Sequence, residues 1–244
     1  MADLSLISEF NNFGVLLHFV TLPGAYTRGA TEMEAYSKAA QEAALYCEWA
    51  EMPLPKDAPS IAERKEAQNG SRLADADTEI LLSCDRLKLD IDVFDMWCEL
   101  AIRSATSFDT LYDSIRDKDW VQAEKLRPAF YGKTPATARE MLFHADVVSE
   151  YYLSRIGLRS QLTEGKLLEN RKTCVETLRA NYNNEFNIFE ADQELWTETK
   201  VLRRYIWHDR VHGKALYRHG LKMGMDISEM VDTFGFEGVG IIND

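Results

Sequence analysis

Apolar residues recur at helical spacing from about residue 91 to about residue 223. They lie three or four positions apart within four stretches, residues 92–117, 134–156, 165–183 and 197–223. In the first stretch these positions are Phe94, Trp97, Leu100, Ala101, Phe108, Leu111, Tyr112 and Ile115. This period is typical of amphipathic helices that bury one face. Four such helices in succession predict an up-and-down four-helix bundle.

Start and stop signals mark the ends of these predicted helices. Thr134 followed by Pro135 is typical of an N-cap with proline in the first turn. Gly157 and Gly224 stand just beyond the second and fourth helices, where a left-handed residue commonly ends a helix.

The N-terminal part has a different pattern. Residues 15–20 form a β-rich run that the breaker Leu22-Pro23-Gly24 closes. Thr31 with Glu34 three positions later predicts a capping box, and helical spacing follows to about Met52. The polar stretch from 55 to about 76 predicts a solvated connection with at most a short helix.

Residues 78–84 can then form one more strand. A strand, a helix and a strand are too few to be stable alone, so this part needs a partner. The fold class is therefore α+β and mostly α. We expect a small α+β module over 1–88, the bundle over 89–226, and a tail over 227–244 with a short helix at 227–233.

Composition excludes several classes of function. The 244 residues carry a formal charge of −12, which repels polyphosphate, and no basic run is present, so we expect no nucleic-acid partner. The apolar runs are too short to cross a bilayer, so we expect no membrane partner. Cys47, Cys84, Cys98 and Cys174 are dispersed without a C-x-x-C pair, which predicts reduced core thiols and a cytoplasmic location.

Three of the five histidines form a candidate metal site. His208 and His212 are four residues apart in the last predicted helix, so both imidazoles lie on one face. His144 lies in the second predicted helix. A pair on one helix and a single residue across the bundle predict a three-histidine site. The alternative is that each of the three histidines is hydrogen-bonded separately or faces solvent.

Two motifs resemble the DinB/YfiT-like family of four-helix metal-binding proteins. The first is the helix "Arg-Glu-x-Leu-x-His", present as Arg139-Glu140-Met141-Leu142-Phe143-His144. The second comprises Trp196-Thr197, Val201-Leu202-Arg203-Arg204, Trp207-His208 and His212. The resemblance covers about residues 92–224 and implies that His144, His208 and His212 bind a divalent metal. The chain departs from the family at Gly213-Lys214-Ala215, and Gly213 within a helix costs about 1 kcal/mol relative to alanine.

A shorter match resembles a HicB-like module. It consists of Leu22-Pro23-Gly24-Ala25, then Gly29, then Thr31 to Ala35, followed by a helix with Tyr46 and Trp49. In antitoxins this module binds a toxin. Here the resemblance implies a fused accessory or dimer-forming piece.

Several residues near the candidate site have two interpretations each. Glu140 lies one turn before His144, so its carboxylate can orient an imidazole or act as general base, or be a surface charge. Tyr151 is expected on the same helix face as His144, and Tyr205 on the same face as His208, although core packing is the more ordinary role of such tyrosines. His219 is expected at the rim of a cleft, and His18 belongs to the N-terminal module. Arg203-Arg204 and Lys222 form a basic element, either a solvated helix face or a clamp for an anion or a thiol-carboxylate.

Three neutral imidazoles leave a divalent ion with open coordination positions, and this lowers the pKa of a bound water or thiol. Zn, Ni and Fe all suit imidazole. By resemblance, we expect a metal-dependent enzyme, a low-molecular-weight-thiol transferase or a hydrolase, that acts on a small molecule and forms a homodimer. The alternative is a non-catalytic interaction or stress-response protein, in which the HicB-like module binds a partner and the metal is structural.

Overall fold

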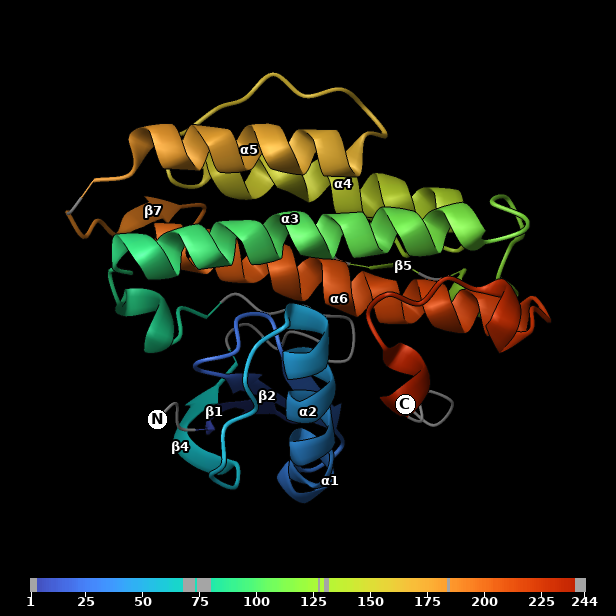
Figure 1. The fold of residues 1–244 in the computed structure, drawn as a ribbon, viewed down its shortest axis with the longest axis horizontal. Coiled ribbons are helices and arrows are strands. Elements are labelled where there is room, and N and C mark those ends of the chain that lie inside the picture. Colours follow the sequence, from blue (N-terminus) through green and yellow to red (C-terminus); the bar gives the residue numbers. More distant parts are fainter. Residues whose placement is uncertain are drawn as a thin grey trace.

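The fold of the chain is described from a computed structural model, which describes residues 4–67, 73, 80–126, 128–129, 132–183 and 185–239. Four long helices lie side by side, and a sheet with two helices lies beside them, next to α6 (Figure 1). The fold is therefore α+β and mostly helical, as predicted. No helix in the described ranges is long and apolar enough to cross a membrane.

The sheet has four strands in the order β3-β2-β1-β4. Strands β1 (Ser5–Asn11), β2 (Gly14–Phe19) and β3 (Tyr26–Gly29) pair antiparallel, whereas β4 (Ser60–Glu66) pairs parallel to β1. One face packs against α1 (Glu32–Ser37) and α2 (Ala39–Ala50), and the other places Leu16 and Tyr26 against α6. Strand β2 is buried along its whole length, as its apolar run predicts.

Two strand predictions differ from the structure. Residues 78 and 79 lie outside the described residues, while 80–83 form no strand and Cys84–Arg86 form a 3-10 helix, η3. The strand beside β1 is instead β4, within the stretch expected to be a solvated connection. β4 lies at the sheet edge, and its residues alternate between exposed and half-buried, so its sequence carries no apolar run. Strand β1 has no counterpart in the predicted elements.

The helical layer consists of α3 (Ile91–Ser114), α4 (Ala138–Ser154), α5 (Leu167–Asn181) and α6 (Glu198–Lys222). α3 and α4 each contact both α5 and α6. All four predicted helices are confirmed, with ends that differ by a few residues. Short elements connect them: η4 (Ala123–Lys125), the pair β5 (Pro128–Ala129) and β6 (Gly132–Lys133), and the pair β7 (Phe189–Ala191) and β8 (Glu194–Trp196).

The helices do not alternate in direction, so the up-and-down order predicted from the sequence is wrong for the middle pair. Asp146 of α4 accepts a hydrogen bond from Asn170 of α5, and one turn on, Cys174 donates to the carbonyl of Ser149. Contacts that advance together in this way make α4 and α5 parallel. The connection over residues 155–166 runs back along the bundle, and twelve extended residues reach about 40 Å, beyond the length of α5.

Helix α6 lies at the centre of the molecule, because it is buried against the helical layer on one side and against the sheet on the other. The Leu22-Pro23-Gly24 turn packs on it closely. A Cβ at Gly24, whose φ is +81°, would lie 2.6 Å from the backbone nitrogen of Trp207. Glycine is therefore required there both for the backbone conformation and for the close approach.

After α6 the chain forms two short 3-10 helices, η5 (Ile227–Glu229) and η6 (Phe236–Val239). The first replaces the short helix expected at 227–233. Phe234 and Phe236 stack on each other and pack against Gly213 of α6.

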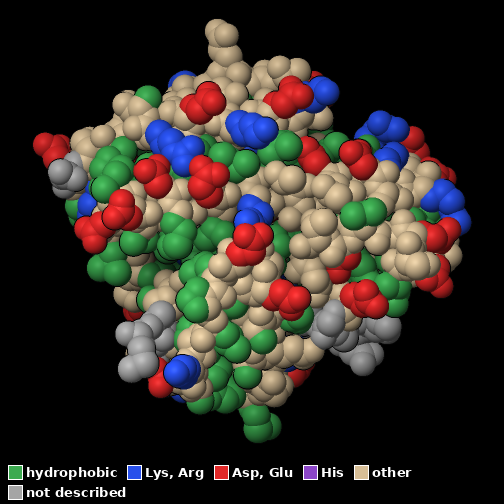
Figure 2. Space-filling model, in the orientation of Figure 1, with side chains coloured by type: hydrophobic (Ala, Val, Ile, Leu, Met, Phe, Trp, Pro, Cys, Tyr) green, Lys and Arg blue, Asp and Glu red, His purple; other side chains and the backbone are tan. Residues whose placement is uncertain are grey.

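Acidic and basic side chains are interspersed over the helical layer on the face in Figure 2.

Candidate metal centre

Helices α4 and α6 bring three histidines together. His144 comes from α4, and His208 and His212 come from α6. Their ring centroids are 5.1 Å apart for His144 and His208, 4.5 Å for His144 and His212, and 4.2 Å for His208 and His212. One ring nitrogen of each lies within 4.8 Å of the others, close enough to share one ion. We call these residues the histidine trio.

The start of α4 fixes the position of His144 and gives the carboxylate of Glu140 a structural role. The helix begins after Thr137, whose hydroxyl accepts from the Glu140 amide at 3.1 Å, rather than after Thr134 as predicted. The Glu140 carboxylate accepts from the backbone amide of Thr137 at 3.2 Å, and also from the amide of Ala136 at 2.8 Å and from Lys133 Nζ at 2.9 Å. It completes a capping box, which is a stronger start signal than the Thr134-Pro135 pair.

The electrostatic state of Glu140 follows from these bonds. The hydrogen bond from Lys133 is the largest cause that holds the pKa of Glu140 below its usual range. Both carboxylate oxygens are engaged at the helix start, so the position has a structural explanation of its own. Its role as general base stays a prediction.

Helix α6 holds its two histidines at a buried site. The Thr197 hydroxyl accepts from the Lys200 amide at 3.0 Å and caps the helix. His208 is 4% exposed and His212 is 9% exposed, whereas His144 is half-buried. The trio therefore opens toward solvent on the α4 side.

Burial keeps the three imidazoles neutral. It lowers the pKa of His144 to about 4, and it is also the largest cause that lowers the pKa of His208 and His212 well below the ordinary value. Neutral imidazole is the form that binds a metal. The buried Nδ1 of His208 has no hydrogen-bond partner among the described residues, which fits a position where an ion or an ordered ligand completes the bonding.

The donor set is three imidazole nitrogens. Among the described residues no carboxylate, thiol or further imidazole joins the group, so Glu140 and His219 do not complete the coordination. Three protein ligands leave at least one position open on a tetrahedral ion. The trio could therefore hold a divalent metal and still admit a small molecule.

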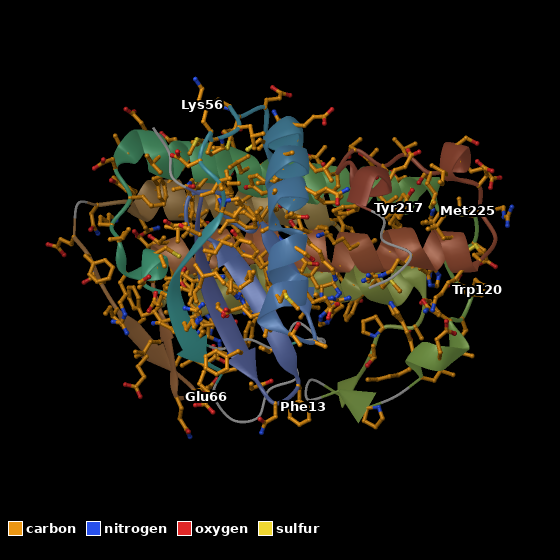
Figure 3. The ribbon with its side chains drawn as sticks, turned by 90° about the horizontal axis from the view of Figure 1, so that it is seen from below. Phe13, Lys56, Glu66, Trp120, Tyr217 and Met225 are labelled. Carbon is orange, nitrogen blue, oxygen red and sulfur yellow. The ribbon has the colours of Figure 1, made fainter. Side chains whose placement is uncertain are left out.

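The other candidate residues occupy distinct places. Tyr205 is buried and donates to the carbonyl of Ser149, and Tyr151 is 40% exposed, with its ring against Tyr152. His219 is buried near the end of α6 with its ring 5.0 Å from that of Trp120. Figure 3 labels Trp120 on the same side of the molecule as Tyr217 and Met225. The prediction that His219 lies at the rim of a cleft is therefore wrong, because the side chain is fully buried. His18 belongs to the sheet, where its Nε2 lies 2.9 Å from Glu9 Oε2.

The predicted basic element divides into three environments. Arg203 forms a buried pair with Asp85 at 2.6 Å, and Lys222 pairs with Glu124 at the surface at 2.6 Å. Only Arg204 lies beside the trio, with its guanidinium over the ring of Tyr152. Two residues near the trio were not predicted as site residues: Tyr152, whose ring lies 6.0 Å from that of His208, and Arg171, which binds Asp209 next to His208. Their distance along the chain from the histidine pair gives no local signal.

The cysteines are buried core residues, as predicted. All four are free thiols. Burial raises the pKa of Cys84 and Cys98 to about 12, which disfavours the thiolate.

Comparison with family models, with curated proteins and with solved structures finds no match to this chain. The histidine trio is therefore the observation from which function has to be argued.

Proposed function

We propose that the protein binds one divalent metal ion at His144, His208 and His212 and that it is a metal-dependent enzyme acting on a small molecule. The convergence of three buried or half-buried imidazoles, with their nitrogens within 4.8 Å of one another, carries this proposal. Zn, Ni and Fe are the metals that we expect for this donor set.

The open coordination favours chemistry over a structural role. Structural metal sites are generally closed by four protein ligands, whereas catalytic sites keep a position for water or substrate. When bound, a divalent ion there lowers the pKa of a coordinated water or thiol toward neutrality. The reaction class that we propose is accordingly transfer to a low-molecular-weight thiol, or hydrolysis.

The role of this chain's own residues follows from their placement. His208 and His212 hold the ion from one rigid helix, and His144 closes the set from α4 at the half-buried side. The ion pair between Asp209 and Arg171 fixes the rotation of α6 about its axis next to His208. These features support a preorganised site on rigid elements.

We further propose that the chain is a divergent DinB/YfiT-like protein with a HicB-like N-terminal part. The two histidine motifs on helices α4 and α6 support this, as does a sheet with a helix after Leu22-Pro23-Gly24. On the same resemblance we propose that the protein forms a homodimer.

The experiment is an assay of metal-loaded protein against a panel of low-molecular-weight thiols with an electrophile, and against activated esters and amides. We expect turnover that depends on metal and is lost in His144→Ala. A metal-loaded protein without turnover on the whole panel, which instead captures a stoichiometric protein partner, would favour the non-catalytic alternative.

A further inference from the structure

Helix α6 carries several cations, and three of them are paired with carboxylates in the core. Arg203 is bound by Asp85, and Arg210 and Lys214 are both bound by Glu42, at 2.8 and 2.9 Å. All three cations are buried. They hold the N-terminal part against α6 and are not available to a ligand.

Arg204 differs from these cations in both exposure and position. It is half-buried, and it lies one turn before His208 on the same face of α6. Its Nη2 donates to the Tyr152 hydroxyl at 3.1 Å, and the guanidinium carbon lies 5.1 Å from the centre of that ring and 4.8 Å from the centre of Trp207. The Tyr152 ring in turn lies 6.0 Å from His208. Two aromatic rings therefore hold a positive charge beside the trio.

Arg171 of α5 also lies near the trio, but it is bound by Asp209, the residue after His208, at 2.6 Å. Its charge is therefore committed to the core, like the charges of Arg203, Arg210 and Lys214.

We infer that the open side of the trio receives the oxyanion group of a small molecule, a carboxylate or a phosphate, and that Arg204 is the side chain that binds it. This inference rests on the proposed function, since the ligand lies against the metal position. A guanidinium presents parallel N–H donors that match an oxyanion, and the flanking rings fix its plane. A bound divalent ion adds attraction of the same sign.

The test uses the full-length chain loaded with Co²⁺, whose visible absorption reports on the coordination of the ion. Acetate and inorganic phosphate are titrated at constant ionic strength, with acetamide as the neutral counterpart of acetate. We expect both anions, or one of them, to change the spectrum saturably, and acetamide to leave it unchanged. The anion that binds more tightly assigns the class of substrate.

The variants are Arg204→Gln, Arg204→Lys and, as a matched control, Arg159→Gln, which removes an exposed arginine that pairs with Glu150. We expect Arg204→Gln to weaken anion binding about tenfold or more, the size of one charge-assisted hydrogen bond, and Arg204→Lys to weaken it less. Arg159→Gln should bind as the parent does. Far-UV circular dichroism and Co²⁺ stoichiometry verify that each variant folds and loads.

Three results are decisive in different ways. Metal uptake with anion binding that depends on Arg204 supports the inference. Metal uptake with no anion binding, or with binding that Arg204→Gln leaves unchanged, overturns the inference and leaves the metal site standing. No metal uptake by the parent protein overturns the proposed function and the inference together.

Discussion

Asp209, which follows the metal-ligand candidate His208 directly, is held by Arg171 through a hydrogen bond of 2.6 Å from Nη1 to Oδ2. Both side chains are fully buried, and the Ser104 hydroxyl donates to the same carboxylate oxygen at 2.6 Å. These residues come from α6, α5 and α3, so the contact ties three helices together. It fixes the rotation of α6 about its axis and thereby the direction of the imidazoles.

Removal of one partner of this pair should be strongly destabilising. Arg171→Met leaves the Asp209 carboxylate buried without its counter-charge, which costs about 3–5 kcal/mol. The measurement is the free energy of unfolding from denaturant titration. The control is Arg179→Met, which removes half-exposed pairs with Asp95 and Glu99 and should cost about 1 kcal/mol or less. Equal losses in both variants would contradict the role assigned to the buried pair.

Gly213→Ala should loosen the C-terminal segment although alanine favours a helix. A Cβ at this position would lie 2.9 Å from Cε2 of Phe234 and 3.2 Å from Cε2 of Phe236. Displacement of two stacked rings should outweigh the gain of about 1 kcal/mol in helix propensity. Faster hydrogen exchange at residues 230–239, together with a lower melting temperature, is the expected result. A more stable protein with unchanged exchange would contradict it.

His219 should make the protein less stable in acid. Burial lowers its pKa to about 4 from an ordinary value of 6.5, so the unfolded chain takes up the proton first. The free energy of unfolding therefore falls as the pH falls from about 6.5 to about 4, and this contribution changes no further below that pH.

The measurement compares the parent with His219→Leu, both free of metal, by denaturant titration at a series of pH values. Both ring nitrogens of His219 lack a hydrogen-bond partner in the described structure, so leucine removes no bond. The variant should lose up to about 1.4 kcal/mol per pH unit of slope between pH 4 and 6.5. Superimposable slopes would mean that His219 is protonated equally in both states.

A fragment of residues 89–244 should not fold stably. It lacks Glu42, which binds Arg210 at 2.8 Å and Lys214 at 2.9 Å in the core. Loss of that carboxylate leaves two buried cations without their counter-charge. Circular dichroism of the fragment should show reduced helicity and no cooperative melting. A fragment that melts cooperatively near the temperature of the whole chain would instead support two independent modules with a boundary at 88.

The long helices and the trio could be predicted because their signals are local. Helical spacing identified all four helices, and the i,i+4 relation placed His208 and His212 on one face. The sheet was predicted less well. β4 is a polar edge strand, and its partner β1 lies about fifty residues away in the sequence, so no local period reveals the pairing.

The helix order and the charged core depend on tertiary contacts. Helices α4 and α5 run parallel because a long connection joins them. The composition of that connection does not indicate that it runs back along the bundle. Arg203 and Arg210 are typical surface residues by type, yet each is buried against a carboxylate from the N-terminal part. Gly213 weakened the resemblance at the sequence level, and the structure gives its physical reason in the packing of Phe234 and Phe236.

The most direct test of the central claim is elemental analysis of purified protein beside the double variant His208→Ala/His212→Ala, with retained helicity verified by circular dichroism. The parent should contain about one divalent ion per chain, and the variant should contain none. His219→Leu serves as the matched control and should retain the ion, because His219 lies outside the trio. Equal metal content in the parent and the double variant would contradict the account.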